Sequence, residues 1–132
     1  HGFNDAPLEN TIYTHDHPEL MKCLTLPLCG DTRTSFCYVR PAKTETFEKY
    51  VSNNLHEYCT IQKSQDLIDD EWFGLFDPSP RLAGRVGDYT LQLKDNHAIL
   101  NSFPGFDPLV MKGHHGGVTA DEMLVPLSAI DC

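Results

Sequence analysis

Residues 88–94 read DYTLQLK, and apolar and polar side chains alternate along the whole stretch. Successive side chains of an extended chain point to opposite faces, so Tyr89, Leu91 and Leu93 share one face and polar side chains take the other. The alternation predicts a half-exposed β-strand. An Asp-Asn pair comes next at positions 95 and 96 and suits a tight turn, which predicts a hairpin with a second strand over residues 97–100.

The stretch from residue 44 to residue 59 predicts an amphipathic helix. Its apolar side chains recur every three or four residues, which places them on one stripe of a helix. Thr44 suits the N-cap, and Glu45 and Glu48 suit the positive end of the helix dipole. The stripe consists of Phe47, Tyr50, Val51, Leu55 and Tyr58.

Shorter strands and an irregular start flank these two elements. Apolar or β-branched runs predict strands over residues 23–28, 35–40 and 60–62. Residues 1–20 mix Gly, Pro, Asn and Asp with few periodic apolar positions, which predicts an irregular segment.

Short helices are predicted where capping residues stand. Ser64 and Ser79 are placed to cap two of them. Thr119 and Glu122 match a capping box, and Pro126 should end the helix that starts there. The order of all these elements predicts an α+β fold, with a small mixed or antiparallel sheet and helices on one of its faces.

Composition limits the classes of function. The chain has 132 residues, 40% of them hydrophobic, which is typical of a globular domain. Asp and Glu number 19 against 10 Lys and Arg, a formal net charge of -9. Such an acidic chain repels phosphate backbones, which argues against nucleic-acid binding. No apolar run approaches the ~20 residues that span a bilayer, so no membrane span is predicted.

Five cysteines are scattered along the chain without CxxC spacing, which excludes a zinc ribbon or a thioredoxin-type motif. Buried free thiols in a reducing compartment are the favoured interpretation. The compartment itself stays open, with the thiols favouring the cytoplasm. The cysteines are Cys23, Cys29, Cys37, Cys59 and Cys132.

The most informative histidines stand at 114 and 115, directly before Gly116 and Gly117. Glycines let the backbone turn sharply beside an imidazole, and the helix predicted after them brings free N–H groups close. Such a loop suits a metal, a phosphate or both. The alternative is a pair of loop histidines that only bind backbone carbonyls. A His-x-His spacing at 15–17 is interpreted as a solvated loop, and His56 and His97 receive no function.

Two segments together resemble the alkaline phosphatase superfamily. Residues 113–127, GHHGGVTADEMLVPL, are similar to its C-terminal His-Gly-Gly motif, above all in bacterial and archaeal phosphodiesterase or nucleotide-pyrophosphatase-like members. Residues 1–7, HGFNDAP, resemble the residues directly after the aspartate of its Asp-His-Gly metal motif. The middle is similar too, in Leu28-Cys29-Gly30-Asp31-x-Arg33, in Phe73-Gly74 and in Arg85-x-Gly87-Asp88-Tyr89.

The resemblance implies a hydrolase of phosphoric esters with two zinc ions, which place positive charge on the entering and the departing oxygen. His1 matches a ligand of the metal on the nucleophile's side, and His115 matches a ligand of the other metal. His114, Gly116 and Gly117 have at most a supporting role. The implied segments are residues 1–20 after the first motif, a cap or insertion subdomain over 21–102, and a metal-ligand loop with a short helix over 103–132.

The superfamily's nucleophile and most of its metal ligands have no match in this sequence. We therefore expect the chain to be the C-terminal part of such an enzyme, inactive alone, with the catalytic part of the same polypeptide as its partner. An exposed apolar patch for that partner, with self-association, is also expected. Two alternatives stay open: a stand-alone metal-binding or interaction module, and a copper enzyme that uses His1 as its N-terminal residue.

Overall fold

The computed structural model describes residues 2–103, 105 and 111–130. Its largest sheet has four strands in the order β3-β4-β6-β5, and every neighbouring pair is antiparallel. The predicted α+β class is confirmed. The strands are β3 (Cys29–Gly30), β4 (Thr34–Cys37), β5 (Cys59–Lys63) and β6 (Tyr89–Leu93).

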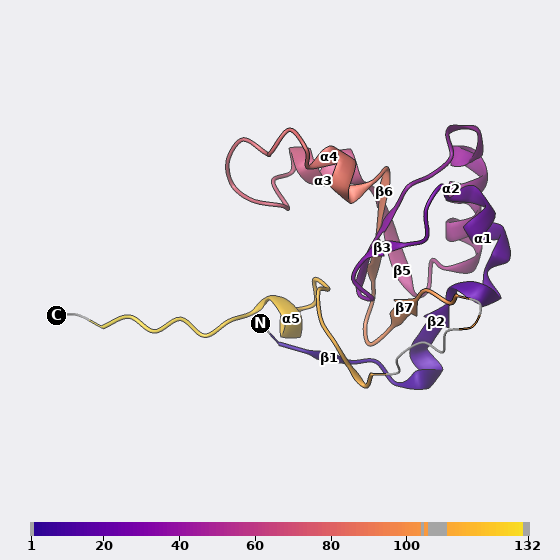
Figure 1. Cartoon of the computed structure of the whole chain (residues 1–132). Helices are drawn as coiled ribbons and strands as arrows, with labels where there is room; N and C mark the ends of the chain where they lie inside the picture. Colours follow the sequence, from indigo (N-terminus) through magenta and orange to yellow (C-terminus); the bar gives the residue numbers. More distant parts are fainter. Residues whose placement is uncertain (1, 104, 106–110, 131–132) are drawn as a thin grey trace.

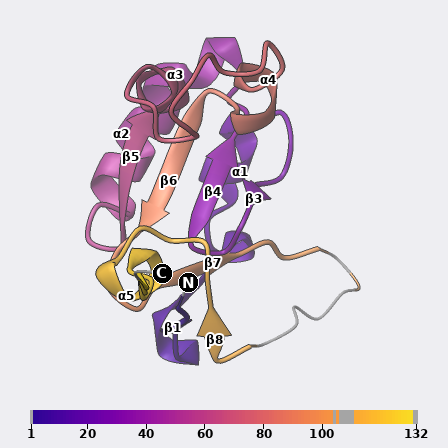
Figure 2. The same cartoon turned by 90° about the vertical axis from the view of Figure 1, so that its left-hand side faces the viewer.

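Two helices, α1 (Pro18–Cys23) and α2 (Thr44–Asn54), cover one face of this sheet (Figure 1). Figure 2 looks onto the opposite face, with the two helices behind the strands. The predicted stripe of α2 packs against alternate residues of the sheet in a single core. The fully buried members from the helix and the turn after it are Phe47, Val51 and Leu55, and those from the sheet include Cys37 and Leu91.

Three further helices among the described residues lie toward the other face. An arm formed by α3 (Ser64–Asp69) and α4 (Ala83–Val86) lies at one end of the strands, and α5 (Ala120–Met123) lies at the other (Figure 1). The Ser64 hydroxyl donates to the carbonyl of Val86 at 2.8 Å and lies 2.9 Å from the Thr90 hydroxyl, which joins the arm to β6.

Two small sheets connect the beginning of the chain to its end. Strand β1 (Asn4–Asp5) pairs antiparallel with β8 (Gly113–His114). Strand β2 (Thr11–Tyr13) pairs parallel with β7 (Ala98–Leu100). The described residues also contain 3-10 turns at Leu8–Asn10, Thr14–Asp16 and Pro41–Lys43.

The predicted hairpin of residues 88–100 is wrong. Strand β7 pairs with β2 and not with β6, although Asp95 does take the left-handed conformation of a tight turn. The backbone N–H of Ile99 donates to the carbonyl of Thr32, and that of Leu93 to the carbonyl of Arg33. The loop before β4 therefore lies where the second hairpin strand was expected.

Strand β6 is also more buried than predicted. All five of its residues are buried, although the expected faces are correct. The apolar face meets the helices, and the polar face, which carries Thr90 and Gln92, is covered by the arm and by the C-terminal segment. A central strand can have both faces covered in this way. The alternation of its residues shows which side chains share a face, but not whether the polar face is buried.

Several boundaries differ from the predicted ones. Residues 1–20 contain short elements. The strand predicted over residues 23–28 is wrong, because Cys23 ends α1 and β3 comprises only Cys29–Gly30. Helix α2 ends at Asn54, and its N-cap position is taken by Lys43, not by Thr44. The predicted division at residues 20 and 102 stays a prediction.

Four of the five cysteines lie among the described residues, and all four are free thiols, as predicted. Three of them are buried in the core. Burial raises the pKa of the Cys59 thiol to about 11, and burial with nearby negative charge raises that of Cys37 further, so both stay protonated at neutral pH. Cys132 lies outside the described residues.

Within the described residues, no helix is long and apolar enough to cross a bilayer.

Candidate functional site

The His-Gly-Gly loop runs from the end of β8 at His114 to the start of α5 at Ala120. The β1–β8 pairing attaches one end of the loop to the beginning of the chain. The other end packs closely on the same segment, since a Cβ atom on Gly2 would lie 2.0 Å from the carbonyl oxygen of Asp121. The two segments that carry the motif resemblance are therefore in contact.

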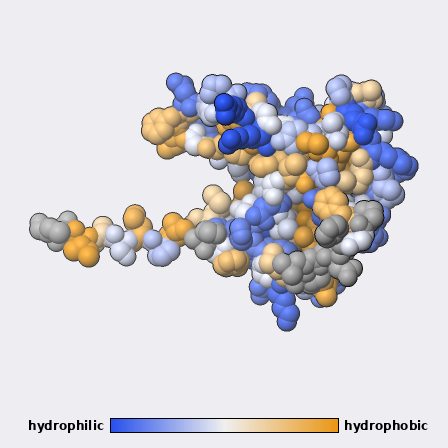
Figure 3. Space-filling model, viewed as in Figure 1, coloured by the Kyte–Doolittle hydropathy of each residue, from blue (hydrophilic) through white to orange (hydrophobic). Residues whose placement is uncertain are grey.

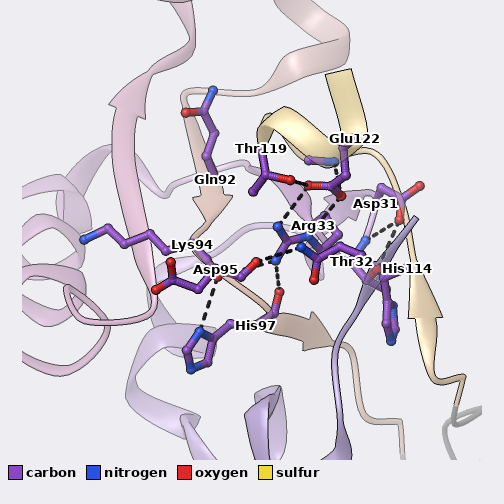
Figure 4. Close-up of polar contacts among 12 residues, drawn as sticks. Asp31, Thr32, Arg33, Gln92, Lys94, Asp95, His97, His114, Thr119 and Glu122 are labelled. Atoms are coloured by element: carbon purple, nitrogen blue, oxygen red, sulfur yellow. Dashed lines mark hydrogen bonds and ion pairs between the residues drawn. The ribbon is translucent and has the colours of Figure 1, made fainter. Parts of the chain in front are cut away.

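A buried ion pair joins this loop to the sheet. Arg33, in the turn between β3 and β4, donates from Nη2 to one oxygen of Glu122 at 2.9 Å and from Nε to the other at 3.1 Å (Figure 4). The two side chains are 0% and 1% exposed. The remaining Arg33 nitrogen donates to the carbonyls of His97 and Lys94. The guanidinium thus connects the loop, the turn after β6 and the sheet.

Glu122 also holds the loop backbone. Its carboxylate accepts the N–H of Gly117 at 3.0 Å and the hydroxyl of Thr119 at 2.7 Å. Thr119 occupies the N-cap position as predicted, but its hydroxyl bonds the carboxylate and not a backbone N–H, so the expected reciprocal capping box does not form. The Gly117 amide is therefore already taken by the chain's own carboxylate.

The contacts of Glu122 control its protonation. Burial alone would raise the pKa of its carboxyl group, but hydrogen bonds from Arg33, Thr119 and Gly117, with the charge of Arg33, lower that pKa to about 2. The carboxylate therefore stays ionised throughout the neutral range, and the loop remains tied to Arg33.

His115 faces a carboxylate. Its Nδ1 lies 3.6 Å from Oδ2 of Asp31, and both side chains are about half exposed. The other oxygen of Asp31 accepts the backbone N–H of Thr32 at 2.6 Å, which orients the carboxylate toward the ring. Phe3 packs against the imidazole edge-on, with the ring centroids 5.6 Å apart. A carboxylate beside Nδ1 favours the tautomer with hydrogen on Nδ1 and makes Nε2 the candidate metal ligand.

His114 is a structural residue. It is 2% exposed, its Nδ1 lies 2.8 Å from the Thr32 hydroxyl, and its Nε2 lies 3.0 Å from the carbonyl of Met111. Both ring nitrogens are therefore engaged within the protein. The Nε2 contact fits the alternative of a loop histidine that binds a backbone carbonyl.

The glycines of the motif are required by close packing. Gly116 has a φ of +87°, and a Cβ atom there would lie 3.1 Å from the side chain of Asp31. A Cβ atom on Gly117 would lie 2.3 Å from the Glu122 carboxylate. Any side chain at either position would push the carboxylates away from the loop.

We expect Gly116→Ala to lower the free energy of unfolding by about 1–2 kcal/mol, because alanine is strained at positive φ. Urea denaturation followed by circular dichroism measures this loss. Gly113→Ala is the matched control, since its Cβ would meet only Phe3 at 3.8 Å, an ordinary contact. Equal stabilities of the two variants would contradict the strain argument.

His115 and Asp31 line a cleft of about 530 Å³ on the sheet face opposite α1 and α2. The space-filling view shows this hollow between the arm and the C-terminal segment (Figure 3). Its walls are aromatic and aliphatic, and some of these residues, Trp72, Phe73 and Met123, are among the exposed large apolar residues. The apolar lining consists of Phe36, Leu67, Trp72, Phe73, Val118 and Met123.

His15 and His17 do not join this site. His15 lies 2.7 Å from the Ser102 hydroxyl and His17 lies 2.9 Å from the Tyr50 hydroxyl, so the two rings of the His-x-His pair have separate partners. His1, the other predicted metal ligand, lies outside the described residues. Its predicted role is therefore untested.

The described residues do not by themselves form a zinc site. Such a site needs three or four protein ligands, and no group of three or more His, Cys, Asp or Glu side chains within residues 2–103, 105 and 111–130 is arranged to hold a metal. His115 with Asp31 supplies one imidazole and one carboxylate that orients it.

Reasoning from the residues did not assign Asp31 or Arg33 to the site, although both stand in a segment that carries the resemblance. Nothing in the sequence around these two residues indicates that the turn between β3 and β4 contacts the His-Gly-Gly loop. Arg33 and Glu122 are 89 positions apart, and only folding brings them together.

Comparisons of this chain with protein-family models, with curated proteins and with solved structures give no match.

Proposed function

We propose that this chain is the C-terminal portion of a two-zinc hydrolase of phosphoric esters, a phosphatase, phosphodiesterase or nucleotide pyrophosphatase. In this proposal His115 is one ligand of one zinc ion and His1 is one ligand of the other. The remaining ligands and the nucleophile belong to a preceding part of the same polypeptide.

One observation carries the proposal. The separate segments that resemble the superfamily meet in space, since Asp31 and Arg33 of the middle segment contact His115 and Glu122 of the C-terminal motif. These contacts use the residues of the motif itself. Gly116 and Gly117 let the loop approach the two carboxylates, and Glu122 fastens it. The arrangement places an imidazole at a cleft beside a carboxylate that orients it, as is common for metal-ligating histidines.

The ligand set is incomplete among the described residues, which supports a portion of an enzyme better than a complete one. One imidazole per ion cannot hold zinc with useful affinity, so the 132-residue chain should not turn over a phosphoester alone. The partly apolar surface at the cleft is of the kind expected where a second part of the protein packs.

We expect no hydrolysis of p-nitrophenyl phosphate or bis(p-nitrophenyl) phosphate by the 132-residue chain with stoichiometric zinc. In the product of the whole reading frame, we expect two zinc ions per chain by elemental analysis and hydrolysis of at least one ester. His115→Ala there should lose about one zinc ion and most of the activity, whereas His56→Ala, an exposed residue away from the cleft, should lose neither.

Three results would contradict the proposal. Turnover by the 132-residue chain would remove the need for a catalytic part elsewhere. A reading frame without an acidic metal motif before His1 would leave the two ions without ligands. Tight one-to-one zinc binding by the chain alone, lost in both His1→Ala and His115→Ala, would favour the stand-alone metal-binding module.

A further inference from the structure

The floor of the cleft carries two polar side chains that pair with no other group in the described ranges. Thr34 of β4 and Gln92 of β6 are directly opposite each other in the sheet and point to the face away from the core. The Thr34 hydroxyl oxygen is buried and has no hydrogen-bond partner among the described residues. Gln92 is 7% exposed, and its side-chain amide takes part in no hydrogen bond within the described part of the chain.

Such groups are costly when they stay unpaired. A buried polar group without a hydrogen bond destabilises a protein by about 1–3 kcal/mol, so native proteins rarely contain one without a reason. Here the Thr34 hydroxyl is such a group, and the Gln92 amide, which also has no hydrogen-bond partner among the described residues, lies beside it at the same cleft. Figure 4 shows the Gln92 side chain apart from the network of dashed contacts around Arg33. An adjacent amide and hydroxyl with unused capacity indicate a ligand with a polar edge.

The walls of the cleft indicate the chemistry of the apolar part of that ligand. Phe36 lies below the arm with its ring centroid 6.2 Å from that of Phe73, and Trp72 lines the same space. The two phenyl rings contact each other and form one aromatic wall, against which a planar ring can pack. The volume of about 530 Å³ lies within the range of sites for small molecules.

The charges around the cleft exclude an anionic group in its apolar part. No Lys or Arg is among the described lining residues, and the two acidic ones are Asp31 and Glu122. Glu122 is neutralised by Arg33, and Asp31 is engaged by Thr32 and faces His115. The floor groups are uncharged. An uncharged ring therefore fits this lining better than a carboxylate or a phosphate.

We propose that the cleft binds an uncharged aromatic group that carries an amide-like edge, with a carbonyl acceptor next to an N–H donor. The ring lies among Phe36, Phe73 and Trp72, and the edge pairs with the Gln92 amide and the Thr34 hydroxyl. That this group is the organic part of the ester substrate rests on the proposed hydrolase function, because His115 lines the same cleft. The binding itself does not depend on that function.

Benzamide is the probe, and Trp72 is the reporter, since it is the single tryptophan of the chain. Titration of the 132-residue chain with benzamide should change the Trp72 emission in a saturable way, with a dissociation constant on the order of millimolar for a ligand of this size. The side-chain NH₂ signals of Gln92 in a ¹H–¹⁵N spectrum should shift with the same dependence. Benzoate, with the same ring and a negative charge, should bind at least about fivefold more weakly.

Two variants test the polar floor. Gln92→Leu and the isosteric Thr34→Val should each weaken benzamide binding by about fivefold, the loss of one hydrogen bond. Thr34→Val removes an unpaired hydroxyl and should fold normally, which keeps the test valid if Gln92→Leu does not fold. Gln62→Leu is the matched control, because Gln62 belongs to the neighbouring strand and does not line the cleft. It should leave binding unchanged.

Absence of saturable binding up to the solubility limit of benzamide would overturn this proposal, and so would equal binding of benzoate. Unchanged affinity in both floor variants would overturn it as well. None of these results affects the zinc content or hydrolysis measured on the whole reading frame, so the two proposals fail separately.

Discussion

Arg33→Met should lower the free energy of unfolding by about 3–5 kcal/mol, a large fraction of the stability of a protein of this size. Methionine retains much of the volume of the side chain but leaves the Glu122 carboxylate buried without its cation. It also removes the donor to the carbonyls of His97 and Lys94. Urea denaturation measures the loss, and the His-Gly-Gly loop should lose protection from amide exchange first.

The control for this prediction separates the ion pair from simple loss of contacts. Arg33→Met combined with Glu122→Met replaces both charges by apolar groups and should recover most of the stability, because no charge is left buried alone. Lys49→Met removes one partner of the exposed Lys49–Glu45 pair and should cost less than about 1 kcal/mol. A double variant as unstable as Arg33→Met would show that the loss does not come from an uncompensated charge.

Low pH should break the Arg33–Glu122 ion pair, which is called the latch from here on. The pKa of Glu122 is about 2 in the folded chain against 4.5 as its ordinary value. Its contribution to stability is therefore complete above about pH 4.5 and is lost as the pH falls through the interval from 4.5 to 2. A shift of this size corresponds to about 3 kcal/mol in all, of which about 2 kcal/mol should be lost between about pH 6 and pH 3.

The measurement compares the wild-type chain with Glu122→Gln, which cannot titrate at this position. The difference in unfolding free energy between them should shrink by about 2 kcal/mol when the pH is lowered from about 6 to about 3, whereas the other carboxylates contribute equally to both proteins. A difference that stays constant over this interval would mean that Glu122 has the same pKa in the folded and unfolded chain.

The latch explains how the candidate site is organised. His115 gains its position from a loop of glycines, and that loop is held by Glu122, whose cation comes from the turn before β4. Gly117 donates its amide to the same carboxylate that a Cβ atom would displace. Loss of Arg33 should therefore disturb His115 although the two residues belong to different segments.

The local sequence correctly predicted the elements whose apolar residues repeat with the period of a helix or of a strand. The stripe of α2 and the alternation of β6 predicted a helix and a strand at the right places, because side chains three or four apart share a helix face and side chains two apart share a strand face. The Gly116-Gly117 pair likewise predicted a sharp turn beside an imidazole, since no other residue tolerates that backbone and that close approach.

Only the tertiary structure decided what these elements contact. The partner of β7 is β2, and the polar face of β6 is buried. Arg33 could have been one more surface cation, and its pairing with Glu122 depends on a closure over 89 positions that neither local sequence contains. Short-range periodicity is encoded in neighbouring residues, whereas the energy of long-range contacts exists only once the chain has brought them together.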